Sequence, residues 1–205
     1  TEIAQTRNDG FPISVETCPH YLHFSSEHIS DGDTRFKCAP PIWGSDNKEK
    51  LWSGLENGII NFITSDHSPC TAELKNLDAG DFEKAWGGIS SIQFTLPVMW
   101  TECKQRGYSL DQLINWMSTQ PAKFIGKDHQ KGQISSGYDA DLVCWNPDKI
   151  YTITKDAIHH KNKLTPYEGE SLYGLVYKTF LRGQKIYDNG EFLDNPTGKI
   201  ILNNE

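Results

Sequence analysis

One run of residues suggests the fold class: Ile59-Ile60-Asn61-Phe62-Ile63-Thr64-Ser65-Asp66-His67-Ser68-Pro69-Cys70. Its first half is apolar and β-branched, a pattern typical of a strand buried on both faces of a parallel sheet. Its second half is polar, and Pro69 ends the strand. In α/β barrels the loops that leave the C-terminal ends of the strands meet at one mouth. Asp66 and His67 are therefore candidate functional residues, although a turn-capping Asp beside a half-buried His gives the same pattern.

A second run repeats this design: Phe11-Pro12-Ile13-Ser14-Val15-Glu16-Thr17-Cys18-Pro19-His20-Tyr21. Two buried strands would thus deliver a histidine, His20, and a carboxylate, Asp66, at their C-terminal ends. Imidazole nitrogen and carboxylate oxygen are ligands that a catalytic zinc site combines. His20 and Asp66 are therefore candidate metal ligands. We expect the neighbouring cysteines to pack as small apolar side chains rather than as thiolate ligands or nucleophiles, namely Cys18, Cys38 and Cys70.

Four motifs in this chain resemble the C-terminal half of the allantoinases, which are cyclic amidohydrolases related to dihydroorotase and dihydropyrimidinase. They are Glu16 to Tyr21, Lys37 to Ile42, Ser65 to Cys70 and Ala85 to Ile89. The resemblance runs from about Val15 to the C-terminus. It implies an α/β fold: residues 1–125 as the C-terminal part of a TIM (β/α)8 barrel, and residues 126–205 as strands of a small β-sandwich.

The resemblance also implies a function, the hydrolysis of the cyclic amide of allantoin to allantoate in purine catabolism. Zn²⁺ in a binuclear site would be the cofactor, with His20 and Asp66 as ligands and Asp66 passing a proton to the leaving nitrogen. Backbone groups of Ala39 and Gly87 would bind the amide edges of the ring. The other ligands, a His-x-His pair, a carboxylated lysine and a further histidine, are expected outside this chain. The family further implies a cytoplasmic homo-oligomer, a tetramer.

Two alternatives remain open from the sequence. The first is another cyclic amidohydrolase, of the dihydropyrimidinase or dihydroorotase type; Cys70 stands where a dihydroorotase would carry a second histidine. The second is a truncated, non-catalytic homologue that acts as an assembly partner, since most of the metal ligands are absent. Trp43 also departs from the family, in which arginine follows Pro-Pro-Ile; tryptophan cannot form the bidentate contacts of arginine.

The remaining elements up to residue 125 follow from periodicity and breakers. We predict a short strand at 35–42 ended by Pro40-Pro41, and a helix at 45–56 that buries Leu51, Trp52 and Leu55. The segment 71–86 should be a long binding loop or lid. Further helices are expected at 90–105, where Pro97 should kink or split the helix, at 109–117 with Ser109 as N-cap, and at 119–125.

Beyond Gly126 the pattern becomes all-β. Short β-rich runs occupy 132–134, 140–145, 150–154, 176–181, 185–187 and 191–192. Asp188-Asn189-Gly190 between the last two is typical of a hairpin turn.

Composition excludes several classes of partner. The 205 residues are 37% hydrophobic and carry a net charge of −7, so no basic surface is expected to bind nucleic acid. No apolar run is long enough to span a bilayer, so we expect no membrane association. The small-molecule substrate is an expectation that the family resemblance implies. The five cysteines show no CxxC spacing, which favours a reducing compartment such as the cytoplasm.

Overall fold

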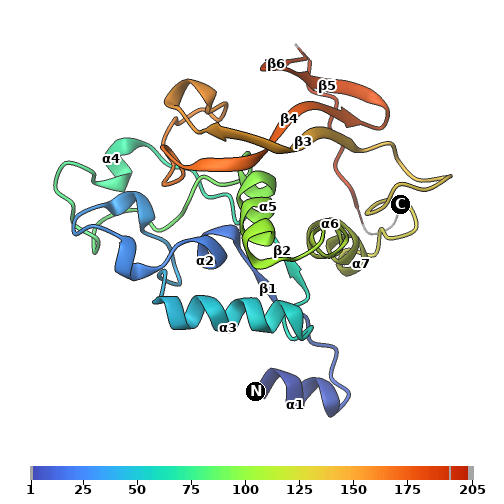
Figure 1. Cartoon of the computed structure of the whole chain (residues 1–205), viewed down its shortest axis with the longest axis horizontal. Helices are drawn as coiled ribbons and strands as arrows, with labels where there is room; N and C mark the ends of the chain where they lie inside the picture. The colour runs from blue at the N-terminus through green and yellow to red at the C-terminus, as the bar shows by residue number, and fades with distance from the viewer. Residues whose placement is uncertain (1, 194, 203–205) are drawn as a thin grey trace.

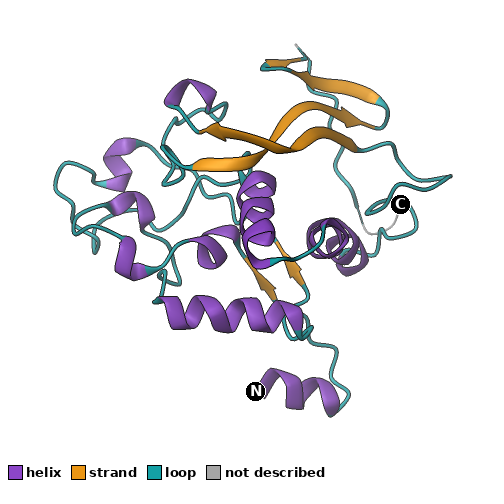
Figure 2. Cartoon of the chain, viewed as in Figure 1, coloured by secondary structure: helices purple, strands orange, loops and turns teal. Residues whose placement is uncertain are grey.

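The computed structural model describes residues 2–193 and 195–202 (Figure 1). Helices surround a two-stranded parallel sheet in the first part of the chain, and a four-stranded antiparallel sheet follows in the second part. Figure 2 shows the antiparallel strands lying across one end of helix α5 (Thr95–Arg106), with helix α3 (Ser45–Glu56) on the opposite side of the molecule. The chain is therefore α/β at its start and all-β at its end, as its sequence indicates.

The parallel sheet consists of β1 (Glu16–Thr17) and β2 (Phe62–Ile63). Glu16 lies opposite Phe62 and Thr17 opposite Ile63, which confirms the predicted parallel pairing. Both strands are shorter than the β-rich runs that predicted them. One reason is the side chain of Asn61, whose Oδ1 accepts a hydrogen bond from the Val15 N–H in place of a backbone partner.

Helix α1 (Glu2–Asn8) is joined to the start of β2 by one arginine. The guanidinium of Arg7 donates to the carbonyl oxygens of Gly58 and Ile59 and to Oδ1 of Asn61. Arginine suits this role because its planar group presents several donors in a fixed geometry. The N-terminal helix is thus held by hydrogen bonds to two backbone carbonyls and one side-chain amide rather than by a buried apolar face, since none of its residues is buried.

The predicted strand at 35–42 is wrong. Asp33 caps a 3₁₀ turn, Thr34–Phe36, and its carboxylate also pairs with the side chain of Arg35. The segment then passes through a cis Ala39-Pro40 peptide bond as irregular backbone. A capped turn at one end and two residues without N–H groups at the other leave few donors for a sheet ladder.

Helix α3 confirms its prediction, with Trp52 and Leu55 buried. Trp52 also donates its indole N–H to the carbonyl of Leu22, at 3.0 Å. Helix α5 begins at Thr95 rather than at residue 90, so the predicted kink is wrong. Pro97 lies in the first turn, where a missing N–H has no intrahelical partner to lose.

The helices expected at 109–117 and 119–125 form one continuous helical segment. Ser109 caps α6 (Leu110–Ile114) in a capping box with Gln112, as predicted for Ser109. A π-helical turn, Asn115–Thr119, then leads directly into α7 (Gln120–Phe124). Pro121 lacks the N–H that the regular α pattern would require at this point, which accounts for the wider turn before it.

The antiparallel sheet has the order β3 (Leu142–Thr152), β4 (Ser171–Leu181), β5 (Gln184–Asp188) and β6 (Glu191–Phe192). The runs predicted at 140–145 and 150–154 are one strand with two register shifts against β4, one between Cys144 and Trp145 and one between Asn146 and Ile150. The run at 132–134 forms no strand. The hairpin turn is confirmed, because β5 and β6 pair across Asn189 and Gly190, both with positive φ.

Two apolar cores hold these elements together. The first lies among α2 (Pro19–His23), α3, β2, α5, α6 and the π-helical turn, and it includes Trp52, Met99 and Trp116. The second joins Phe94 and Val98 to residues of the second part of the chain: Ile153, Ile158, Tyr167 and Leu172. Residues on both sides of position 126 thus share one core. Within the described ranges, no helix has the length and apolarity needed to cross a membrane.

The isolated chain should associate in solution, because large apolar side chains remain exposed. Phe11, Ile92 and Phe124 are 62%, 60% and 61% exposed, and Ile92 lines an apolar cavity of about 670 Å³ between α5 and the antiparallel sheet. Size-exclusion chromatography with light scattering should give a mass that rises with protein concentration. A compact monomer with a cooperative unfolding transition would contradict this expectation.

Candidate functional site

His20 lies one residue beyond the start of α2, which follows β1 directly. Pro19 occupies the first helical position, where its fixed φ favours the helix and its missing N–H costs nothing. The His20 side chain is fully buried, and its ring packs edge-on against Tyr21 with centroids 4.2 Å apart. The histidine therefore lies in a helical turn just after the strand and not at the strand end itself.

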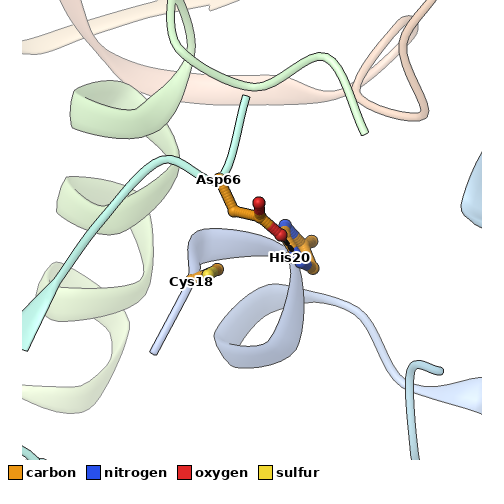
Figure 3. Close-up of side chains that lie close together, drawn as sticks. All are labelled: Cys18, His20 and Asp66. Carbon is orange, nitrogen blue, oxygen red and sulfur yellow. Dashed lines mark ion pairs between the residues drawn. The ribbon is translucent and has the colours of Figure 1, made fainter. Parts of the chain in front are cut away.

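Asp66 follows β2 at the corresponding place. Its φ of 44° is in the left-handed region, which only a few per cent of non-glycine residues adopt. Its side chain remains 46% exposed, while one carboxylate oxygen, Oδ2, lies 3.9 Å from Nε2 of His20 (Figure 3). The structure thus brings the two predicted ligands together, with the imidazole inside and the carboxylate toward solvent.

The contact between His20 and Asp66 is neither a hydrogen bond nor an ion pair at neutral pH. A separation of 3.9 Å is too long for a hydrogen bond. Burial, followed by the positive charge of Lys75, lowers the pKa of His20 to about 4, so its ring is neutral at pH 7. A neutral imidazole that keeps a free lone pair is the form that binds metal ions.

Both ring nitrogens of His20 are buried without a hydrogen-bond partner among the described residues. Such groups are rare in folded proteins, since each unpaired buried polar atom costs about 1–3 kcal/mol. Ligand atoms of Cys18, His20 and Asp66 lie within 4.8 Å of one another, close enough to surround one cation. The unpaired imidazole and the adjacent carboxylate therefore fit a metal site.

Cys18 is the least suited of the three to bind a metal as a thiolate. Burial, followed by the negative charge of Asp66, raises the pKa of its thiol to about 12. Burial likewise raises the pKa of Cys38 and of Cys70. Thiols in such surroundings stay protonated and unreactive, in keeping with the packing role expected for these cysteines.

Ala39 and Gly87, the predicted substrate-binding residues, also lie side by side. A Cβ placed on Gly87 would be 3.7 Å from Cβ of Ala39 and 3.9 Å from its backbone nitrogen. Both residues are exposed, and none of their backbone N–H and carbonyl groups forms a hydrogen bond within the described part of the chain. These two residues thus offer backbone donors and acceptors to a ligand.

A short ladder joins the Gly87 loop to the segment after Asp66. His67 pairs with Ile89 in a parallel bridge, and the Ser68 N–H donates to the Ile89 carbonyl at 3.0 Å. On the other side, the Gly88 N–H donates to the carbonyl of Lys37, at 3.0 Å. The loops that carry Asp66, Gly87 and Ala39 are therefore consecutive neighbours.

The residues that flank Asp66 are both fixed by Ser91. Nδ1 of His67 accepts the Ser91 N–H at 3.0 Å, and the Ser91 hydroxyl donates to the Ser65 carbonyl. The sequence pattern marked Asp66 and His67 as candidate functional residues, but it did not identify Ser91. A serine in a loop after Gly-Gly carries no pattern that would have revealed this contact.

Lys75 contacts the loops of the site, and the sequence analysis did not identify it as a functional residue. It ends α4 (Ala72–Lys75), inside the segment expected to be a long loop, and it is only 3% exposed. Its ammonium donates to the carbonyl oxygens of Lys37, Trp86 and Gly88. Burial lowers its pKa to about 8. The segment 71–86 is therefore not only a loop: it contains a short helix, and the lysine of that helix binds the backbone of the loops that carry Ala39 and Gly87.

Two other residues lie away from this site. His23 is largely buried and pairs with Glu102 at 2.8 Å. Burial acts to lower its pKa, but hydrogen bonds to Glu102 and Glu170 raise it overall. Trp43, the departure from the family pattern, is 61% exposed.

Comparison with known proteins finds relatives that are similar to this chain in sequence and in structure. The model of the amidohydrolase family matches residues 19–186. A probable allantoinase 2 of Dictyostelium discoideum is 47% identical over 98% of this chain and 40% of its own length. The allantoinase of Arabidopsis thaliana is 45% identical over 98% of this chain and 40% of its own length.

A solved structure is also similar. The L-hydantoinase (dihydropyrimidinase) of Arthrobacter aurescens superposes with a TM-score of 0.87 at 30% sequence identity, covering 94% of this chain and 43% of that protein. The chain spans less than half the length of the curated relatives that it matches.

Gly88→Ala should destabilise the protein, because an added Cβ would lie 2.5 Å from Cβ of Ser68 and 2.8 Å from its carbonyl oxygen. We expect a loss of about 1–3 kcal/mol, the usual cost of overpacking. Gly87→Ala is the matched control, since its Cβ would meet Ala39 at an ordinary 3.7 Å. The thermal unfolding midpoint of Gly88→Ala should lie well below that of Gly87→Ala. Equal midpoints would show that there is room for a Cβ between Gly88 and Ser68.

Proposed function

Because this chain belongs to the amidohydrolase family, we propose that it forms part of an enzyme that hydrolyses the cyclic amide of allantoin to allantoate. The support comes first from the relatives, since proteins named as allantoinases are 47% and 45% identical over nearly the whole chain. The activity proposed is that of a whole protein containing these residues. The observation that carries it is the buried, neutral and unpaired imidazole of His20 beside the carboxylate of Asp66.

In this proposal, His20 and Asp66 are ligands of a zinc site. The site is binuclear in the whole protein, and a carboxylated lysine and further histidines complete it from outside these residues. Zn²⁺ bound there supplies Lewis-acid polarisation of an amide carbonyl and lowers the pKa of water. The unpaired nitrogens of His20 support the assignment, because one of them binding a cation removes the cost of leaving it buried and unsatisfied.

Asp66 is also the proposed proton carrier. Ring opening adds water across a C–N bond: the oxygen joins the carbonyl carbon, and a proton must reach the released nitrogen. The Asp66 carboxylate is exposed on its outer side, and no hydrogen bond among the described residues occupies its oxygens. It is therefore free to accept a proton from the attacking water and to donate it to the nitrogen.

The backbone of Ala39 and Gly87 binds the amide edges of the ring in this proposal. A hydantoin ring alternates carbonyl acceptors with N–H donors, and unpaired backbone groups match both. The exposure of the two residues and their free N–H and carbonyl groups support this role. The small side chains let the ring approach the backbone closely.

The proposal extends to the architecture of the whole protein. Residues 1–125 would be the C-terminal part of a TIM (β/α)8 barrel, and residues 126–205 would belong to a β-sandwich-type segment. The parallel pairing of β1 with β2 and the antiparallel sheet β3–β6 support this division. We further propose a cytoplasmic homo-oligomer, a tetramer by family resemblance; the five free thiols are consistent with a reducing compartment.

A second candidate substrate class is favoured by the structural comparison. The similar solved protein is named as a hydantoinase and dihydropyrimidinase, so hydantoins or dihydropyrimidines are the alternative. Its 30% identity is below the 47% of the allantoinase relative, which is why allantoin is preferred.

The test uses a joined protein, in which these 205 residues replace the matching region of the 47%-identical relative, so that the remaining ligands are supplied. Asp66→Asn in the joined protein should lower kcat by about 100-fold or more, because an amide cannot carry the proton. Metal content should stay close to that of the unaltered joined protein, as the amide oxygen still coordinates. Steady-state turnover of allantoin and elemental analysis measure the two effects.

The matched control is Asp78→Asn, an exposed aspartate in the 71–86 segment. It should leave turnover and metal content unchanged. Near-normal turnover in Asp66→Asn would remove the proton-carrier role. If the unaltered joined protein hydrolyses dihydrouracil or hydantoin but not allantoin, the alternative substrate class is correct; if it binds metal but hydrolyses none of them, the chain is a non-catalytic homologue.

A further inference from the structure

We propose that Lys75 is a positioning residue that fixes the backbone of the Ala39 and Gly87 loops and thereby sets the affinity for the cyclic-amide substrate. This inference rests on the proposed function and deepens it. Lys75 forms no hydrogen bond or ion pair with His20 or Asp66 among the described residues. Its charge contributes to the low pKa of His20, but its hydrogen bonds all go to the loops, and the positioning effect acts through them.

The contacts of Lys75 lie where two loops meet. Its Nζ is 2.7 Å from the Lys37 carbonyl oxygen, 3.0 Å from that of Trp86 and 2.6 Å from that of Gly88. The last two carbonyls stand immediately before and after Gly87. An ammonium has three N–H donors, so each donor is matched by one acceptor. One buried side chain therefore binds the backbone of both loops.

The charge of Lys75 is balanced by backbone dipoles alone. No carboxylate pairs with it among the described residues, although burying an unpaired ammonium is costly. Three charge-assisted hydrogen bonds offset this cost only while the three carbonyl oxygens converge on Nζ. Any rotation of the peptide units that carry these carbonyls would lose a hydrogen bond to a buried charge. The ammonium therefore holds those peptide units in one orientation.

That orientation bears directly on Gly87. In a trans peptide the carbonyl and the N–H of the next residue point in opposite directions. Since the Trp86 carbonyl points at Lys75, the Gly87 N–H points away from the buried ammonium. Gly87 is exposed, and its N–H has no partner among the described residues. Lys75 thus presents the Gly87 N–H outward as a donor for a carbonyl of the ring.

The neighbouring contacts transmit the same constraint to Ala39. The Lys37 carbonyl accepts from both Lys75 and the Gly88 N–H, so both of its lone pairs are used. This shared acceptor keeps the segment that leads to Ala39 in register with the Gly87 loop. Gly88 itself has no room for a side chain, because Ser68 lies against it. The loops and Lys75 form one packed unit.

Lys75→Met in the joined protein is the first test. Methionine keeps most of the volume and removes the three donors, so the loops lose their common partner. KM for allantoin should rise at least tenfold, while kcat changes less than threefold and metal content is unchanged. The control is Lys84→Met, which removes an exposed lysine of the same segment that pairs with Asp81; its KM should be unaltered.

Lys75→Arg is the second variant, and the same measurements are made on it if Lys75→Met does not fold. It keeps the charge, but its planar group cannot direct three donors to three converging carbonyls as an ammonium does, so KM should again rise. An unchanged KM in the variants that fold, or a fall in kcat with KM unchanged, would overturn the proposal.

A measurement without substrate separates this inference from the proposed function. Hydrogen–deuterium exchange of the joined protein should show faster exchange at the Gly88 amide in Lys75→Met than in Lys84→Met, because the acceptor of that amide, the Lys37 carbonyl, is no longer fixed. Unchanged exchange overturns the positioning role. If exchange rises but the unaltered joined protein has no activity toward allantoin, the proposed function fails while the fixing of the loops by Lys75 stands.

Discussion

The register of one pair of parallel strands determines where the site forms. Thr17 lies opposite Ile63, so the chain leaves both strands at the same edge and at the same level. His20 is the third residue after Thr17, and Asp66 is the third residue after Ile63. A shift of one strand by one residue would turn its side chains to the opposite face relative to the other strand and separate the imidazole from the carboxylate. Strands of two residues are sufficient because hydrogen bonds from Asn61 and Thr64 extend the pairing at both ends.

Around this pair, the site is held by groups that act on backbone rather than on one another. Ser91 holds the residues on either side of Asp66, and Lys75 holds those on either side of Gly87. These loops bury a few apolar side chains, among them Cys38, Ile42 and Ile89, and the polar contacts to backbone groups add to that packing. The loops that would contact a substrate are thus more strongly defined than their lack of regular secondary structure suggests.

Sequence patterns predicted the features that depend on neighbours in the chain. Parallel pairing, the helix at 45–56, the Ser109 cap and the Asn189-Gly190 hairpin all follow from local periodicity or turn chemistry. The strand at 35–42 was wrong because a capped 3₁₀ turn competes with extended backbone there. The contacts of Lys75 could not be predicted, because its three partners are backbone carbonyls, which every residue carries, and no partner side chain marks them in the sequence. The pairing of Ala39 with Gly87 came from family resemblance and not from periodicity.

The central claim is that His20 is a metal ligand, and metal content measures it most directly. In the joined protein, His20→Ala should weaken metal binding by more than the ~10–100-fold that loss of a supporting residue causes. Elemental analysis after dialysis should then show less metal per chain than in the unaltered protein and in the control His28→Ala, an exposed histidine whose Nδ1 lies 2.8 Å from Oγ of Ser25. Full metal retention in His20→Ala would contradict the account.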